Sequence, residues 1–191
     1  NNHALDGGRA SSAMEKEAKQ SLDKLKEYFK DPVQLYGYAI KQITTTDTTF
    51  LFASRIIETR KFSEESTSLF DFLLSEAKKR NVDYTGVRIF HFEETGNNTR
   101  KIFAGISINR SIKTNENELV NFKMMPYQKN LLAVDYEGPY YNVKKINEAL
   151  EEYRMDNNMG SMAIPFHKYL SDGYGFTDSQ VVKLRVCFPV Y

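Results

Sequence analysis

The sequence predicts an α+β protein in which two β-β-α-β-β halves form one pseudo-twofold antiparallel sheet. Both helices are expected on one face of this sheet, with an additional helix at the N-terminus. Two observations lead to this prediction. Segments rich in Tyr, Phe, Ile and Thr alternate with two amphipathic helical segments. The same order of segments then occurs a second time at a near-constant spacing, which is typical of an internal duplication.

The N-terminal region is expected to lie outside the repeat. Residues 1–13 are small and polar and are predicted to be a disordered lead-in. Residues 14–32 are predicted to form an amphipathic helix, since Ala18, Leu22 and Leu25 recur at helical spacing. The pair Asp31-Pro32 is expected to end this helix.

The repeat itself is assigned to residues 33–191, with a first half at 33–110 and a second half at 115–191. In the first half we predict strands at 35–43, 50–58, 87–92 and 101–108 and a helix at 63–80. In the second half we predict strands at 118–125, 130–137, 164–170 and 181–190 and a helix at 142–157. A glycine-rich loop is expected at 172–175.

The two halves align segment by segment. The first two strands match as 38–53 with 118–133, and the last strands match as 101–108 with 183–190. The helices between them align Leu69 with Ile146. The match is one of pattern and order, which supports the internal duplication.

Composition excludes several classes of function. Lys and Arg number 26 and Asp and Glu 25, so the net charge of +1 gives no strong electrostatic case for nucleic acid or an anionic membrane. No apolar run approaches the roughly 18 residues that a membrane helix needs. A single cysteine, Cys187, excludes an internal disulfide and a zinc site built from cysteines. We therefore expect no cofactor, no metal, no direct nucleic-acid binding and no membrane insertion by this segment.

The chain begins at Asn1 rather than Met, which leaves room for an upstream domain, a targeting segment or an anchor in a longer protein. The compartment is therefore left open, with the cytoplasm favoured.

Aromatic residues indicate a binding groove between the two halves. The chain has 12 Tyr and 13 Phe, more than two small helix–sheet cores require, and one sheet face is expected to be bare. The alignment of third strands pairs Phe90 with His167 and Phe92 with Tyr169. We predict that these four side chains line the groove, with Tyr136 and Tyr140 at its rim. The alternative is that the aromatic residues simply complete the core between helices and sheet.

Several short motifs add a family resemblance. Residues 136–140 (Tyr-Glu-Gly-Pro-Tyr), 149–151 (Ala-Leu-Glu), 165–169 (Pro-Phe-His-Lys-Tyr) and 188–190 (Phe-Pro-Val) resemble the C-terminal half of the GyrI-like family. This family contains the effector-binding domains of bacterial AraC- and MerR-type transcription regulators and also stand-alone proteins. The resemblance implies a duplicated domain whose pocket takes amphipathic, often cationic molecules through aromatic side chains and a buried glutamate. It also implies that hydrolysis of electrophilic small molecules is an activity of some stand-alone relatives.

One position departs from the family motif. The family has Pro-Phe-Glu-x-Tyr, whereas this chain has His167 at the place of the glutamate. An imidazole with Lys183 and Arg185 on an adjacent strand does not attract a cation, so we expect neutral or anionic ligands. The alternative is that both cations point to solvent and His167 is a hydrogen-bonded spectator.

Three functions are compatible with these observations. The favoured one is a non-enzymatic module that takes a small hydrophobic or amphipathic organic ligand, for sensing or sequestration. The second is a small-molecule hydrolase with His167 as general base, assisted by Tyr169 or Tyr140. The third is a haem or tetrapyrrole carrier, because the SOUL family has a similar duplicated architecture.

Overall fold

The computed structural model describes residues 6–28, 31–46, 49–114, 119–125, 130–161, 163–170 and 180–191. It consists of two compact units, Asn1–Ala39 and Ile40–Tyr191. The glycine-rich loop predicted at 172–175 and the first five residues of the predicted lead-in lie outside the described residues. In the described part of the chain, no helix is both long and apolar enough to cross a membrane.

The first unit contains two helices. Helix α1 (Asp6–Tyr28) starts eight residues before the predicted position and leaves Leu22 and Leu25 about half exposed. Helix α2 (Pro32–Tyr36) occupies part of a segment that was predicted as a strand. The reason is local: the Asp31 carboxylate accepts a hydrogen bond from the Val33 amide at 2.9 Å, and Pro32 stands in the first turn. Asp31-Pro32 therefore starts a helix, and Gly37, at φ 76°, ends it.

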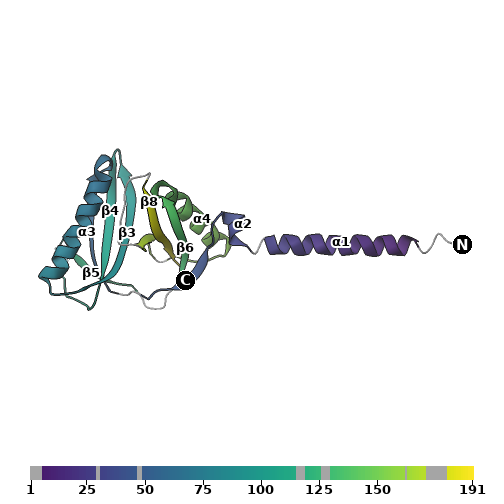
Figure 1. Ribbon diagram of the computed structural model, residues 1–191, viewed down its shortest axis with the longest axis horizontal. Coiled ribbons are helices and arrows are strands. Elements are labelled where there is room, and N and C mark those ends of the chain that lie inside the picture. Colours follow the sequence, from purple (N-terminus) through teal and green to yellow (C-terminus); the bar gives the residue numbers. More distant parts are fainter. Residues whose placement is uncertain are drawn as a thin grey trace. The chain divides into compact units, whose positions relative to one another are not determined.

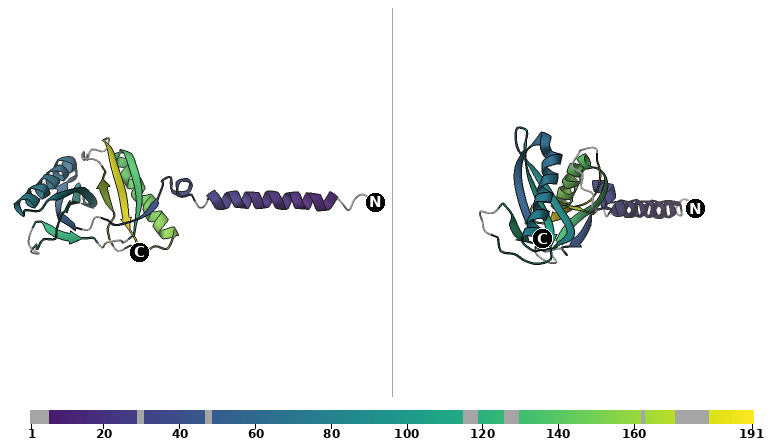
Figure 2. Two further views of the ribbon diagram at one scale, coloured as in Figure 1. Left: turned by 60° about the horizontal axis from the view of Figure 1, so that its bottom comes forward. Right: turned by 60° about the vertical axis from the view of Figure 1, so that its left-hand side comes forward.

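The second unit is one eight-stranded antiparallel sheet with helices (Figures 1 and 2). The order of strands across the sheet is β1-β6-β8-β7-β3-β4-β2-β5. The first half comprises β1 (Lys41–Thr44), β2 (Thr49–Glu58), the 3₁₀ turn η1 (Thr59–Lys61), α3 (Phe62–Lys79), β3 (Tyr84–Gly96) and β4 (Thr99–Ile108). The second half comprises β5 (Asn121–Met124), β6 (Asn130–Pro139), η2 (Tyr140–Asn142), α4 (Val143–Asp156), β7 (Phe166–Tyr169) and β8 (Val181–Pro189). The predicted fold class is confirmed.

The sheet has a pseudo-twofold arrangement whose centre is the β3–β7 pair. Phe90 lies directly opposite His167 there, and these two residues are equivalent in the alignment of the halves. The first strand of each half is exchanged: β1 pairs with β6, and β5 pairs with β2. The registers correspond closely. In the first edge pair, Lys41 lies opposite Ala133. In the second edge pair, Asn121, the residue equivalent to Lys41, lies opposite Phe52. Exact equivalence would place it opposite Ala53, so the two registers differ by one residue.

Helices α3 and α4 pack on the same face of the sheet. Phe70 of α3 contacts the rings of Phe90 and Tyr169, and Asn147 of α4 contacts His167. Since Phe90 and His167 are direct cross-strand partners, their side chains lie on the same face. Both helices end at equivalent positions, but α3 has 18 residues and α4 has 14, so α3 carries one additional turn at its N-terminus.

The strand exchange requires the sheet to curl. β1 is the first strand of the sheet and β2 the seventh, a separation of about 29 Å if the sheet were flat. The chain from Thr44 to Thr49 spans at most about 18 Å. The sheet therefore bends so that its edges approach each other. Ile43 of β1 and Met125, which follows β5, pack on a buried cluster on the helix-free face: Phe50, Ile89, Leu131, Phe166 and Cys187.

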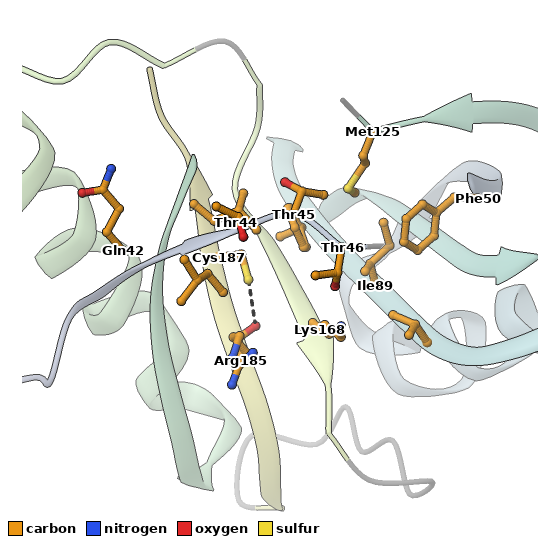
Figure 3. Close-up of a pocket in the computed structure, with 14 residues that line it drawn as sticks. Gln42, Thr44, Thr45, Thr46, Phe50, Ile89, Met125, Lys168, Arg185 and Cys187 are labelled. Atoms are coloured by element: carbon orange, nitrogen blue, oxygen red, sulfur yellow. Dashed lines mark hydrogen bonds between the residues drawn. The ribbon is translucent and has the colours of Figure 1, made fainter. Parts of the chain in front are cut away.

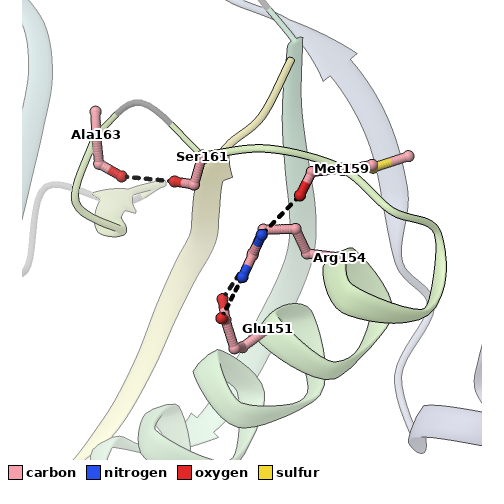
Figure 4. Close-up of polar contacts among 5 residues, drawn as sticks. All are labelled: Glu151, Arg154, Met159, Ser161 and Ala163. Carbon is pink, nitrogen blue, oxygen red and sulfur yellow. Dashed lines mark hydrogen bonds and ion pairs between the residues drawn. The ribbon is translucent and has the colours of Figure 1, made fainter.

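The end of α4 is tied to the chain that follows it (Figure 4). The Arg154 guanidinium donates two hydrogen bonds to the Glu151 carboxylate, at 2.6 and 2.9 Å, and one to the Met159 carbonyl at 2.6 Å. Beyond it, Gly160 and Tyr191 exchange backbone hydrogen bonds at 3.2 and 3.1 Å. These contacts hold the connection that leads into β7.

Gly105 provides a test of the packing under the curled sheet. A Cβ at this position would lie 2.8 Å from Cγ1 of Ile89, which is buried in the helix-free cluster. We expect Gly105→Ala to lower the free energy of unfolding by about 1–3 kcal/mol in chemical denaturation. The double variant Gly105→Ala/Ile89→Ala should lose less than the sum of the two single changes. Additive losses would contradict this packing.

Candidate functional site

Five of the six predicted site residues lie together beneath the two helices, and four of these five are buried. Phe90 and His167 are each 1% exposed, Tyr140 is 4% and Tyr169 is 5%. The structure therefore places these side chains on the helix-covered face, whereas the sequence analysis expected a groove on the bare face. The reason lies in the register, because His167 is opposite Val186, a fully buried residue whose face of β8 packs under the helices.

An aromatic cluster surrounds His167 on this face. Phe62 is its central member and lies edge-on to Phe90 and Phe92, with ring centroids 5.9 and 5.2 Å away, and 6.2 Å from Tyr140. The sequence analysis missed Phe62, which stands at the first position of the additional turn of α3. The one feature of the sequence that points to Phe62 is that the helical segment of the first half is longer than that of the second half. We define the aromatic cluster as Phe62, Phe70, Phe90, Phe92, Tyr140 and Tyr169.

Tyr136 has a different place from the other predicted site residues. Its hydroxyl donates to the Pro139 carbonyl at 2.9 Å and accepts from the Asn142 amide at 3.2 Å. Its ring lies so close over Gly138 that a Cβ there would collide with the hydroxyl. Tyr136 thus orders the corner between β6 and η2, and through that corner it positions Tyr140.

The His167 imidazole has only long polar contacts. Tyr140 Oη lies 3.4 Å from Nδ1, and Asn147 Nδ2 lies 3.5 Å from Nε2. Burial, with a smaller contribution from the charge of His91, lowers the pKa of His167 to about 3. The imidazole is therefore neutral at pH 7. Asn147 Oδ1 is also buried and has no hydrogen-bond partner among the described residues.

These properties limit the chemistry available at this site. A neutral imidazole whose conjugate acid has a pKa of about 3 is a weak general base at pH 7. Burial also raises the pKa of Tyr169 well above its ordinary value, so its phenol stays protonated. The arrangement favours hydrogen bonding to a neutral molecule over proton abstraction.

Lys183 and Arg185 lie away from His167, contrary to expectation. Both alternate with Val186 along β8 and belong to the helix-free face. Lys183 pairs with Glu137 at 3.5 Å, and Arg185 binds Asp135 through hydrogen bonds of 2.6 and 3.1 Å. Their charges therefore do not act directly on the His167 ring.

The helix-free face contains two adjoining cavities. One has a volume of about 390 Å³, and the other about 440 Å³. In Figure 3, Arg185 and Cys187 lie on one side of the first cavity and Phe50, Ile89 and Met125 on the other. Burial raises the pKa of Cys187 to about 12, so this residue is a thiol rather than a nucleophilic thiolate at pH 7. Among the residues that the structure describes, no group of three or more His, Cys, Asp or Glu is placed to hold a metal ion.

The pH dependence of stability tests the burial of His167. Because its pKa is about 3 in the folded chain and near 6.5 when unfolded, the unfolded state binds more protons between these values. Stability should therefore fall as pH drops from 6.5 towards 3, by about 1.4 kcal/mol per pH unit well inside this window. Urea denaturation at pH 7 and 5 should show a smaller loss for His167→Gln than for the wild type. Equal losses would show that the imidazole is not buried in this way.

Comparisons with known proteins agree at the level of the fold. No family model matches the sequence, and no curated protein is similar enough to count as a relative. The EcmrR C-terminal domain matches 81% of this chain and 98% of its own length, with a TM-score of 0.57 and 15% identity. EcmrR in a complex with DNA matches 97% of this chain and 69% of its own length, at TM-score 0.63 and 17% identity. A hydrolase from Listeria innocua matches 86% of this chain and 98% of its own length, at TM-score 0.50 and 13% identity.

The similarity to EcmrR extends over nearly the whole of this chain, and the resemblance to the GyrI-like family in its motifs is consistent with that similarity. At these identities the comparisons establish shared architecture. The second unit has the fold of the EcmrR C-terminal domain, as the resemblance to GyrI-like effector-binding domains led us to expect.

Proposed function

We propose that the second unit is a non-enzymatic binding module for a small aromatic or amphipathic organic molecule, used for sensing or sequestration. The ligand would bind between α3 and α4, against Phe90, Phe92, Tyr140, His167 and Tyr169, with Tyr136 supporting the rim. The observation that supports this site is a buried polar pair, His167 and Asn147, beneath the aromatic cluster.

This polar pair is poorly satisfied for an ordinary core. A buried polar group without a good hydrogen bond costs about 1–3 kcal/mol, so cores normally avoid it. Here the His167 contacts are 3.4 and 3.5 Å long, and Asn147 Oδ1 has no partner among the described residues. A ligand with one donor and one acceptor would shorten these contacts while its apolar part packs on the aromatic rings. The neutral imidazole favours an uncharged ligand.

Phe62 is the side chain that such a ligand would replace. It fills the space between Phe90, Phe92 and Tyr140, and the Arg100 guanidinium covers it at 4.8 Å from the ring centroid. Lys61, the residue that precedes α3, makes no side-chain capping hydrogen bond. Displacing Phe62 from the cluster would cost about as much as its truncation, roughly 3 kcal/mol, which the packing of the ligand on the same rings would have to offset.

The alternative functions have less support from the geometry. A hydrolase needs a general base or nucleophile, and the neutral His167 and the buried Tyr169 are weak in both roles. A haem carrier needs an accessible axial ligand, yet both His167 nitrogens face protein groups. The similarity to EcmrR and to GyrI-like effector domains supports binding, and the Listeria innocua hydrolase keeps turnover as a second candidate.

Ligand charge provides the first test. Matched cationic, neutral and anionic aromatic amphiphiles should be screened by thermal unfolding with the wild type and with His167→Glu. At about 100 times its dissociation constant a neutral ligand should raise the wild-type Tm by roughly 5–11 °C. Cations should stabilise only His167→Glu. If cations stabilise the wild type as well as neutral ligands do, the proposed role of His167 is wrong.

Truncation of Phe62 provides a second test. Phe62→Ala should lower the free energy of unfolding by about 3 kcal/mol, because it empties a buried site. Neutral aromatic ligands that stabilise the wild type should bind this variant more tightly and recover much of the loss. Leu69→Ala, on the same helix and also buried, is the matched control and should gain no such recovery. Equal recovery in both variants would contradict a site at Phe62.

A further inference from the structure

We propose that the groove on the helix-free face is a second ligand site, selective for an amphipathic organic anion. The side chains that carry this proposal, Lys168, Arg185 and Phe103, lie on the opposite face of the sheet from His167, so the proposal stands independently of the function proposed above. Its two adjoining cavities share a floor that includes Phe50, Ile89, Leu131 and Phe166. Each volume, about 390 and about 440 Å³, lies within the range of small-molecule sites.

A single row of cross-strand partners runs along this groove. From β2 to β6 the row is Phe52, Gly105, Ile89, Lys168, Arg185 and Asp135, each directly opposite the next. Direct partners share a face of the sheet, so a molecule lying across the strands meets these groups in this order. Gly105 has no side chain, and the neighbouring Ile89 side chain occupies the space that a Cβ at Gly105 would need.

One end of the row is cationic. Lys168 lies opposite Arg185, and Arg185 and Lys41 both pair with the Asp135 carboxylate, at 2.6 and 3.6 Å. These four residues are three cations and one carboxylate. Lys168 and Arg185 line the first cavity, and the residues that line either cavity in the described part of the chain include no Asp or Glu. The groove is therefore suited to an anionic group and unsuited to a cation.

The other end is aromatic, and a lysine lies over each of two rings, Lys123 at 4.2 Å from the Phe52 centroid and Lys101 at 4.9 Å from the Phe103 centroid. The rings of Phe52 and Phe103 lie 6.1 Å apart, and the His91 ring lies 5.6 Å from Phe103. All three residues line the second cavity. Ile164 and Met124, which also line it, are 46% and 62% exposed, so apolar surface continues to the mouth of the groove.

The pseudo-twofold arrangement makes this difference between the ends informative. In the alignment of the two halves, His91 occupies the position equivalent to Lys168. In the same alignment, Phe103 occupies the position equivalent to Arg185. Two equivalent halves of a groove therefore differ at the positions that would contact a ligand. A molecule with an aromatic or apolar part and one carboxylate or sulfonate matches a groove that combines aromatic rings with cations.

Fluorescence titration with a dansyl-labelled octanoate tests the site. The neutral primary amide of the same molecule and its trimethylammonium analogue serve as matched ligands. We expect the carboxylate to bind the wild type most tightly and the ammonium least. Lys168→Gln should weaken carboxylate binding about tenfold and leave the amide unchanged, because the lost contact is a charge-assisted one. Phe103→Gln should weaken the carboxylate and the amide together.

Three control variants separate this site from the surface and from the other face. Lys183→Gln removes an exposed cation from β8, the strand of Arg185, at a position that does not line either cavity. This variant should leave binding unchanged. Phe62→Ala and His167→Glu alter the helix-covered face, which is proposed above to take an uncharged ligand, so both should leave the affinity for the carboxylate unchanged. Equal affinity for all three ligands, or no binding of any of them, would overturn the proposal. Loss of binding in the His167 or Phe62 variants but not in Lys168→Gln would also overturn it.

Discussion

The pairing of β3 with β7 is the contact on which the rest of the second unit depends. It brings Phe90 opposite His167 and joins the two halves at the middle of the sheet. β7 has only four residues, so the exchange of β1 and β5 supplies much of the remaining hydrogen bonding between halves. That exchange, with its short connections, forces the curvature. A covered face and a hollow face therefore follow from one topological arrangement.

Much of this fold could be predicted from the sequence. Strand and helix types followed from periodicity, and the alignment of the two halves placed Phe90 and His167 in equivalent positions, where the structure pairs them. The face of the sheet could not be predicted in the same way. Alternation shows that His167 and Tyr169 share a face, but only the register with Val186 shows that this face lies under the helices. Phe62 escaped notice because it belongs to a turn that the second half lacks.

The two faces of the sheet differ in their electrostatics although the same strands form both of them. On the covered face, burial keeps His167 neutral, and its contacts are an amide and a phenol. On the hollow face, Lys168 and Arg185 stand beside each other, and Arg185 is paired with the Asp135 carboxylate. The sequence analysis expected Lys183 and Arg185, on the adjacent strand, to act on His167, with solvent-facing cations as the alternative. The structure separates them, because Val186 lies opposite His167 and its neighbour Arg185 points to the other face of β8.

The strand exchange also has a consequence for synthesis of the chain on the ribosome. β1 ends at Thr44, and its partner β6 begins only at Asn130. At about 5–20 residues per second, β1 waits several seconds for its partner, and β2 lacks β5 for almost as long. During that interval the first half exposes strand edges that invite pairing with other nascent chains. Cells that make this protein in quantity would therefore depend on chaperones that shield such edges until the second half has emerged.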